Sequence, residues 1–238
     1  MVTAVAQQKS GVGKTTTAIN LGVSLARQGR RVLLVDIDRQ CALTRQLGLD
    51  QRSVVAGVVD VLTARVSARG AIIADVHGVD VIAVGPELAG IEMSLVAELG
   101  RERFLLDAIR DVPDDYEEII IDTPPNLGLL TVNALVCADR VIAPVSAEDE
   151  GAVHGILALR ATLTRLSDRL GRSAPPLIPV LTRWQPHRVS SRRIESAFTM
   201  NATSSLHFRS ITRDDRLSSG HHLRVVRRPT VTIRPIHR

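Results

Sequence analysis

A loop rich in glycine and carrying two lysines separates an apolar strand from a helical pattern near the N terminus. Val2–Ala6 is short and apolar, as a buried strand is, and Thr16–Gln28 places apolar residues at helical spacing. The intervening run is Lys-Ser-Gly-Val-Gly-Lys-Thr-Thr, residues 9–16. Gly11 and Gly13 allow backbone N–H groups to approach an anion without interference from a Cβ atom. This order predicts a phosphate-binding loop at a helix N terminus.

Two side chains of the loop suit a nucleotide with bound magnesium. Lys14 places a compact positive charge on the outer phosphates, and Thr15 offers a hydroxyl to Mg²⁺. The usual P-loop begins with a glycine, and Gln8 stands at that position, so the standard pattern is not met. The sequence therefore predicts a phosphate loop of non-standard pattern that binds a nucleotide with Mg²⁺.

Lysine is almost absent elsewhere in the chain. Of 30 basic side chains only two are lysines, Lys9 and Lys14, and both lie in this loop. Arginine supplies positive charge everywhere else. The pattern indicates two positions where a planar guanidinium cannot replace a flexible ammonium.

The rest of the chain alternates buried strands with helices. Further strands are expected at residues 31–36, 79–84, 118–122, 140–144 and 177–181, and helices at 89–99, 103–110, 129–136 and 153–170. Such alternation is typical of an α/β fold with parallel strands. We expect a P-loop NTPase with a twisted, mostly parallel sheet flanked by helices on both faces.

Three carboxylates follow predicted strands. Asp36 and Asp38 lie at the end of the second strand, and Asp122 ends the apolar run Glu118–Ile121. Ligands of open parallel sheets bind at the carboxyl ends of the strands. Carboxylates beside a triphosphate can hold Mg²⁺ or order a water molecule. The competing interpretation is that these acids only cap the turns that follow.

These motifs together resemble the ParA type of deviant Walker A ATPases. The family's loop reads KGGVGKTT, its second strand ends in VDxDPQGN, and its switch segment reads IDxPPSLGLLT. This chain has corresponding residues at 9–16, 35–42 and 121–131. It departs from the family at Ser10, at Arg39 and at Cys41-Ala42, and the resemblance covers about residues 1–197.

The resemblance implies a role for each matching position. Lys9 is the signature lysine that reaches the partner subunit's phosphates, Lys14 acts within the subunit, and Asp38 orients the attacking water. Thr15, Asp36 and Asp122 are implied near the metal. Thr182 and Arg183 fall where the family contacts adenine, although a plain turn at the end of a strand explains them equally well. The implied phosphate-binding residues are Lys9, Ser10, Gly11, Val12, Gly13, Lys14, Thr15 and Thr16.

The resemblance also implies partners. We expect an ATP-dependent homodimer, nonspecific DNA binding and a ParB-like centromere-binding protein, in a cytoplasmic, nucleoid-associated setting without membrane binding. Residues 183–238 hold 12 arginines against 3 acids, which favours a polyanion partner. Candidate DNA contacts are Arg183, Arg188, Arg192 and Arg193. Charge alone is equally compatible with a merely solvated basic surface, and the cargo is left open.

The C-terminal segment has a different character. We expect residues 1–197 to form the ATPase domain and residues 198–238 to form an atypical basic tail, either disordered or a remnant of final helices. Apolar periodicity fades in this tail. We therefore hypothesise a truncation or a change of reading frame beyond about residue 197.

Three other functions compete with a ParA-type partitioning ATPase. A membrane-positioning ATPase of the MinD type needs a terminal amphipathic helix, but residues 224–238 contain Pro229 and Pro235 and lack an apolar face. A reductase with a bridging iron–sulfur cluster needs paired cysteine ligands, but Cys41 and Cys137 stand far apart. A degenerate homologue that binds nucleotide or DNA without turnover is the main alternative.

Overall fold

The computed structural model describes residues 1–85, 95, 97–112, 114, 116–149, 151–185, 191–192, 194, 209–213 and 223–225. The described strands form one sheet in the order β3-β4-β2-β5-β1-β6-β7-β8-β9. Neighbouring strands from β4 to β8 pair in parallel, whereas β3 with β4 and β8 with β9 pair antiparallel. The strands are β1 (Val2–Val5), β2 (Val32–Asp36), β3 (Ile72–Val76), β4 (Val79–Ile82), β5 (Glu118–Asp122), β6 (Arg140–Ser146), β7 (Leu177–Thr182), β8 (Arg209–Arg213) and β9 (Leu223–Val225). The expected mostly parallel sheet is confirmed.

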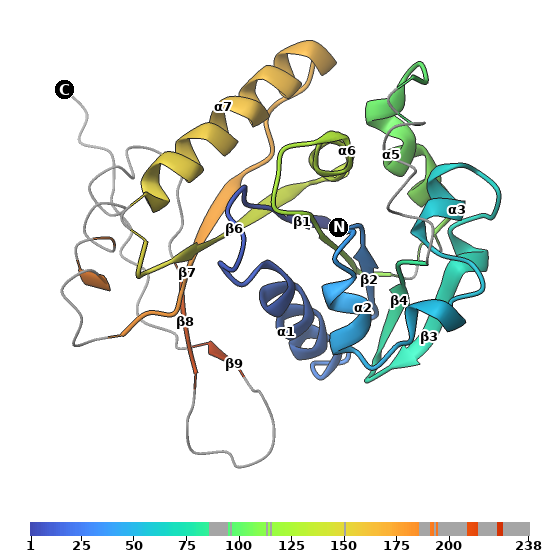
Figure 1. Cartoon of the computed structure of the whole chain (residues 1–238), viewed down its shortest axis with the longest axis horizontal. Helices are drawn as coiled ribbons and strands as arrows, with labels where there is room; N and C mark the ends of the chain where they lie inside the picture. Colours follow the sequence, from blue (N-terminus) through green and yellow to red (C-terminus); the bar gives the residue numbers. More distant parts are fainter. Residues whose placement is uncertain are drawn as a thin grey trace.

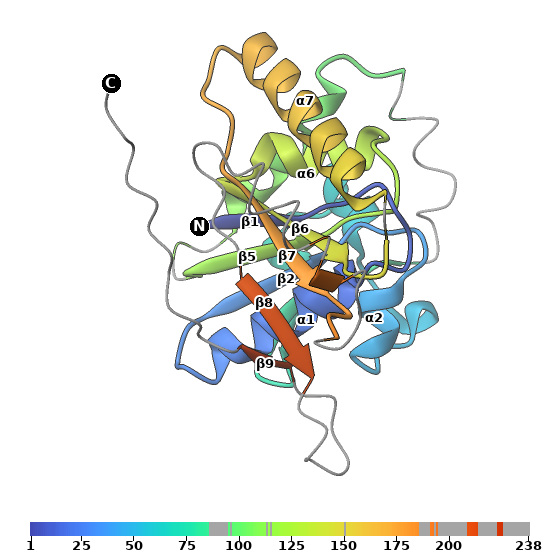
Figure 2. The same cartoon turned by 90° about the vertical axis from the view of Figure 1, so that its left-hand side faces the viewer.

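Helices cover both faces of this sheet (Figures 1 and 2). The α-helices are α1 (Lys14–Ala26), α2 (Ala42–Gln46), α3 (Val58–Leu62), α5 (Phe104–Ala108), α6 (Leu129–Cys137) and α7 (Ala152–Leu170). Apolar side chains of α1 and α2 pack on one face, and those of α3, α5, α6 and α7 pack on the other. None of the described helices combines the length and apolar character needed to cross a membrane.

The central strands are apolar on both sides because both faces are covered. In β2, Leu34 packs toward α1 and α2 while Leu33 and Val35 pack toward the opposite helices. In β5, Ile120 and Ile121 divide in the same way. Side chains of a strand alternate between faces, so a run without polar residues is what a doubly covered strand requires. This explains why the central strands were readable from sequence.

Parallel pairing gathers the carboxyl ends of the central strands. In the register of the sheet, Val5 at the end of β1 lies beside Asp122 at the end of β5. Asp36 at the end of β2 lies on the other side of Asp122. The glycine loop leaves β1 at the same edge and leads directly into α1. The fold therefore brings the loop and the predicted carboxylates to one place.

The opposite edge of the sheet is held by a buried charge. The Glu118 side chain is fully buried and pairs with Arg140 at 2.9 Å and with Arg30 at 3.3 Å. Thr3 donates to the same carboxylate, and Arg140 donates to the Thr3 hydroxyl. A buried carboxylate is tolerated when its oxygens are satisfied in this way. The network joins β1, β5 and β6 at their N-terminal ends.

Several elements differ from the sequence prediction. The short helices α2 and α3 and the strand β3, which pairs with the predicted strand β4, were not predicted, because five-residue elements show little periodicity. Residues 103–110 form 3₁₀ and α turns rather than one helix. The predicted helix 89–99 lies mostly outside the described residues. Within residues 198–238, β8 and β9 are described, and the remainder lies outside.

Gly57 tests the packing between α3 and the end of β4. A Cβ atom at Gly57 would lie 2.6 Å from the backbone nitrogen of Gly85, so Gly57→Ala forces the backbone to move. We expect the free energy of unfolding to fall by about 1–3 kcal/mol, measured by urea denaturation. Gly151 also precedes a helix, but a Cβ there would lie 3.5 Å from an Asp149 oxygen. Gly151→Ala is the matched control, and equal stability of the two variants would contradict the packing argument.

Candidate functional site

The glycine loop takes a backbone conformation that depends on its glycines. Gly11 and Gly13 have φ angles of 69° and 92°, a region that side chains with a Cβ rarely adopt. Ser10 is not among the residues with positive φ, so the serine at this position causes no such strain. Gly13 immediately precedes α1, so the first turn of that helix faces the loop. The loop thus presents backbone N–H groups and a helix N terminus together.

Lys14 lies inside the loop rather than on the surface. Its side chain is buried, and its Nζ atom donates to the Lys9 carbonyl oxygen at 3.3 Å. Burial lowers the pKa of Lys14, while the nearby Asp122 and Asp38 carboxylates partly oppose that shift. Thr15 is half-buried beside it and Thr16 is exposed. Lys14 is therefore held with its charge close to the carboxylates at the ends of β2 and β5.

Asp122 is a buried carboxylate without a hydrogen-bond partner. Its side chain is 0% exposed, and neither oxygen accepts a hydrogen bond. Burial, with the Asp36 charge added to it, raises the pKa of Asp122 to about 8. The Thr15 hydroxyl partly offsets this shift, although it forms no hydrogen bond of ordinary geometry. An orphaned buried carboxylate is costly, which points to a ligand that it serves.

Asp36 is equally buried but fully engaged by its own chain. One oxygen accepts from the Asp38 backbone N–H at 3.1 Å, and the other accepts from the Thr44 backbone N–H and hydroxyl at 2.9 and 2.7 Å. Burial still raises the pKa of Asp36 to about 6. Asp36 was expected near the metal shell. As found, its oxygens fix the turn that carries Asp38, and Asp122 is the carboxylate left open.

Asp38 lies within a tight turn between β2 and α2. Its Oδ1 atom accepts from the Gln40 backbone N–H at 3.0 Å, and its carbonyl oxygen accepts from the Cys41 N–H at 2.8 Å. Cys41 has a φ of 52°, a conformation that favours glycine, and it directly precedes α2. Cys41 stands where the family's pattern has glycine, and its backbone takes a conformation that glycine adopts without strain. The side chain of Asp38 is almost completely buried.

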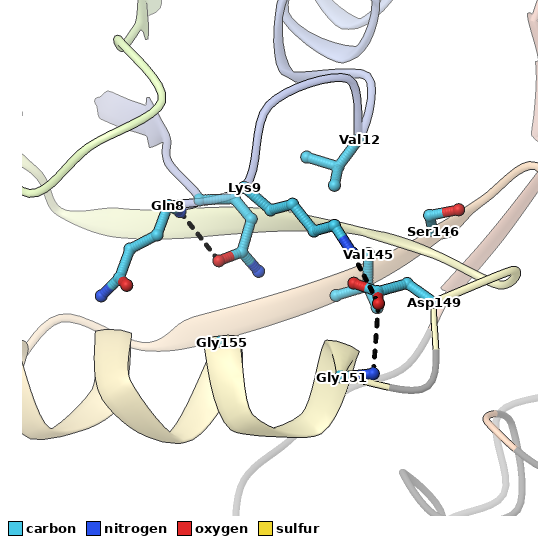
Figure 3. A pocket seen from close by; sticks show the side chains of 9 residues that line it. Gln8, Lys9, Val12, Val145, Ser146, Asp149, Gly151 and Gly155 are labelled. Atoms are coloured by element: carbon cyan, nitrogen blue, oxygen red, sulfur yellow. Dashed lines mark hydrogen bonds and ion pairs between the residues drawn. The ribbon is translucent and has the colours of Figure 1, made fainter.

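Lys9 extends away from the phosphate loop. Its Nζ atom pairs with the Asp149 Oδ1 atom at 2.6 Å across a pocket between the loop, the end of β6 and the start of α7 (Figure 3). The same Asp149 oxygen accepts from the Gly151 N–H at 3.1 Å. The lysine side chain is 58% exposed and the aspartate 16%. The signature lysine is thus held within its own subunit.

The two predicted adenine contacts lie at the end of β7, as its last residue Thr182 and the next residue Arg183. The Thr182 hydroxyl donates to the Val12 carbonyl oxygen at 2.8 Å, and its methyl group would lie 3.6 Å from a Cβ on Gly13. Thr182 therefore supports the loop backbone. Arg183 is exposed and has a φ of 54°. The structure thus brings Thr182 to the loop from the end of β7, and Arg183 follows it in the chain.

Sequence reasoning missed two residues of this site. Thr44 bonds to Asp36, but a threonine on a five-residue helix gave no signal. Asp149 pairs with Lys9, but it stands in an acidic stretch that also suits an ordinary surface turn. Asp149 is remote from Lys9 in the sequence, whereas Thr44 bonds to Asp36 over eight residues through a turn that local pattern does not give, so only the fold reveals these contacts.

The residues present fit a phosphate-bound magnesium ion. Among the described residues, no cluster of three or more His, Cys, Asp or Glu is placed to hold a metal alone. Mg²⁺ typically binds through one or two carboxylates together with substrate phosphates and water. The open Asp122 carboxylate and the Thr15 hydroxyl offer oxygen ligands to such an ion. The loop N–H groups would hold the phosphates that share it.

Comparisons with known proteins agree with this geometry. Residues 1–174 match a family model described as an AAA domain. The sporulation initiation inhibitor protein Soj of Bacillus subtilis is 47% identical over 148 residues, which are 62% of this chain and 58% of Soj. The chromosome partitioning protein ParA of Myxococcus xanthus is 43% identical over 145 residues, which are 60% of this chain and 51% of ParA. The chain thus spans about half to three fifths of the length of these relatives.

A solved structure is similar over most of the chain. Cobyrinic acid a,c-diamide synthase from Mycobacterium smegmatis, with bound ADP and magnesium, has a TM-score of 0.76 and 34% identity to this chain. The similarity covers 85% of this chain and 82% of that protein.

Asp122→Asn tests the cost of the open carboxylate. Because the pKa of Asp122 is raised from 3.8 to about 8, the folded chain keeps a proton that the unfolded chain releases between about pH 4 and pH 8. The stability of the chain without nucleotide and Mg²⁺ should therefore fall as the pH rises through this window. Asparagine removes the titration, so the fall should be smaller in the variant.

Thermal unfolding at several pH values from 4.5 to 8 measures this difference. Asp168→Asn, which changes an exposed carboxylate on α7, is the control and should keep the wild-type pH dependence. An unchanged pH dependence in Asp122→Asn would contradict the assigned burial cost.

Proposed function

This chain belongs to the AAA-domain family and is of the ParA type, and from that premise we propose that it binds and hydrolyses ATP with Mg²⁺ to drive partitioning of a cargo. The chain's activity would be that of a slow ATPase whose two subunits close on two nucleotides. We further propose that residues 1–197 form the ATPase domain and that residues 198–238 are a basic extension.

One observation carries the ATPase proposal. A glycine loop at a helix N terminus, a buried Lys14 and an unpartnered Asp122 carboxylate meet at the carboxyl edge of the sheet. Burial of the Lys14 ammonium without an anion, or of the Asp122 carboxylate without a cation, costs free energy. Phosphates satisfy the loop and the lysine, and a magnesium ion satisfies the carboxylate. The similar structure that holds ADP and magnesium supports the same assignment.

The chain's own residues divide the work. Loop N–H groups and Lys14 bind the phosphate oxygens, and Lys14 neutralises charge that grows on the outer phosphate during cleavage. Thr15 and Asp122 would hold the magnesium ion. Bound Mg²⁺ supplies positive charge to the phosphate oxygens and helps to align them. Asp38 orients the water that attacks the outer phosphate, and the turn that follows β2 fixes its position.

We propose that Lys9 acts in trans in an ATP-bound homodimer. In the single chain it pairs with Asp149 at 2.6 Å, so dimerisation requires that this ion pair breaks. The pair is partly exposed, and such pairs contribute little to stability. Its exchange for a phosphate contact on the partner subunit is therefore feasible, because phosphate carries more negative charge than a carboxylate.

The remaining partners follow from the family and the charge distribution. We propose nonspecific DNA binding through arginines of the C-terminal third, a ParB-like partner that stimulates hydrolysis, and a cytoplasmic, nucleoid-associated location. Arg183 and Arg192 are among the described residues, whereas Arg188 and Arg193 lie outside them. Contacts of arginines with phosphates predict binding that weakens steeply with salt.

ATP turnover tests the ATPase proposal. We expect Mg²⁺-dependent turnover that Lys14→Ala and Asp38→Ala each reduce by at least about 100-fold, because each removes a contact specific to the reacting phosphate or water. Lys14→Arg should also fail, since a guanidinium does not fit the buried site. Phosphate release is measured with and without nonspecific DNA.

Asp168→Ala serves as the control carboxylate, since its side chain is exposed on α7. Its turnover should match that of the wild type. ATP binding without turnover above the Lys14→Ala background would instead identify a degenerate homologue that binds nucleotide only.

Asp149→Asn tests the competition for Lys9. Without the aspartate charge, Lys9 is released, and the ATP-dependent dimer should form at a lower protein concentration than in the wild type. Sedimentation velocity with a slowly hydrolysed ATP analogue and Mg²⁺ measures this. Lys9→Ala should prevent dimerisation, and Asp168→Asn should leave it unchanged. Weaker dimerisation in Asp149→Asn would show that Asp149 supports the dimer instead of competing with it.

A further inference from the structure

A chain of hydrogen bonds connects the end of β4 to Asp38 through Thr44. The Thr44 hydroxyl donates to the Asp36 Oδ2 atom at 2.7 Å and accepts from the Val84 backbone N–H at 3.1 Å. The Thr44 N–H donates to the same Asp36 oxygen at 2.9 Å. The other oxygen of Asp36 accepts from the Asp38 N–H at 3.1 Å. Thr44, Asp36 and Val84 are completely buried, so water does not compete for these bonds.

The backbone at the Val84 end of this chain of bonds is held by further contacts. The backbone around Val84 is held by the Val58 N–H, which donates to the Ala83 carbonyl oxygen at 2.9 Å. The Gln51 amide donates to the Gly85 carbonyl oxygen at 2.8 Å. Gly57 packs so closely on Gly85 that a Cβ atom would not fit. Thr44 is therefore bonded to a fixed part of the sheet edge.

The other end of the chain of bonds is the turn that carries Asp38. β2 ends at Asp36, and one further bond ties the start of the turn to β5, from the Ile37 N–H to the Asp122 carbonyl oxygen at 3.1 Å. The turn is closed by two backbone donors, the Gln40 and Cys41 N–H groups, which bond to Asp38 itself. These local bonds shape the turn, and the Ile37 bond sets its start beside β5. Beyond Ile37, the Asp38 N–H is held by the Asp36 carboxylate, and the orientation of that carboxylate depends on Thr44.

We propose that Thr44 is a positioning residue for ATP hydrolysis, which fixes the Asp38 carboxylate through Asp36. The proposal rests on the proposed ATPase function and deepens it. The Thr44 hydroxyl bonds to Asp36 and Val84, and it makes no hydrogen bond to the open Asp122 oxygens. Its effect should therefore fall on the reaction step and not on nucleotide affinity. A hydroxyl is required because one group must both donate to Asp36 and accept from Val84.

Two substitutions separate this role from simple packing. Thr44→Val has almost the same shape but removes the hydroxyl, so it cannot donate to Asp36 or accept from Val84. Thr44→Ser keeps the hydroxyl and removes only a methyl group. We expect Thr44→Val to lower kcat for ATP by about 10- to 100-fold, since misplacement of a reacting group by about 1 Å can cost 100-fold. Nucleotide affinity should stay within about twofold of wild type, and Thr44→Ser should retain most of the wild-type kcat.

Amide hydrogen exchange provides a readout that does not need turnover. In the wild type, the Val84 and Asp38 N–H groups should be protected, because both donate to this chain of bonds. Thr44→Val should lose protection at both, and Thr44→Ser should keep it. Thermal unfolding of each variant shows that the compared proteins are folded.

The outcomes are separable. Loss of kcat and of Asp38 protection in Thr44→Val, with both kept in Thr44→Ser, supports the proposal. Wild-type kcat or wild-type Asp38 protection in Thr44→Val overturns it, and so does an equal loss in both variants. A wild type without turnover would count against the ATPase function, and Asp38 protection would then still decide whether Thr44 positions the turn.

Discussion

The structure depends on a cluster of buried charges at the carboxyl edge of its sheet. Asp36 and Asp122 are neighbours in the register of β2 and β5, and the Lys14 ammonium lies close enough to change the pKa of Asp122. Burial of like charges is unfavourable, and only part of that cost is offset within the chain. Asp36 is satisfied by the turn that follows it, whereas Asp122 is not. The Asp122 carboxylate is thus left without a partner at the carboxyl ends of the strands. The glycine loop places anion-binding groups beside it.

The same edge explains how the other residues act. Thr182 holds the loop from β7, Thr44 holds Asp36 from the direction of β4, and Asp149 holds Lys9 from the end of β6. Thr182 ends β7, Thr44 lies on α2 and Asp149 follows β6, so the site is assembled by the fold and not by any one segment. The interior contacts are buried and therefore fix geometry, whereas the partly exposed pair of Lys9 and Asp149 can exchange partners. A fixed phosphate-binding loop with an exchangeable lysine is compatible with the nucleotide-dependent dimer proposed above.

The sequence was informative where one segment carries the whole signal. The strand 118–122 was predicted with its observed bounds, because a strand covered on both faces is uniformly apolar. The phosphate loop is also one continuous segment, and it leads directly into α1 as predicted. Asp36 and Asp122 looked alike, since each ends an apolar strand, and only the turn beyond β2 supplies donors to one of them. Thr44 meets Val84, and Asp149 meets Lys9, because of the order of the strands, which local pattern does not give. The helix predicted at 89–99 and most of the tail lie outside the described residues.

The affinity for ATP with and without Mg²⁺ tests the central claim most directly. If the open Asp122 carboxylate serves a metal that the nucleotide shares, calorimetric titration of the full chain should give clearly tighter ATP binding with Mg²⁺ than with a chelator. The Asp122→Asn variant should lose most of that difference and keep the weaker binding to the loop. Equal affinity in both conditions for the wild type, or no binding of ATP at all, would contradict the account of this site.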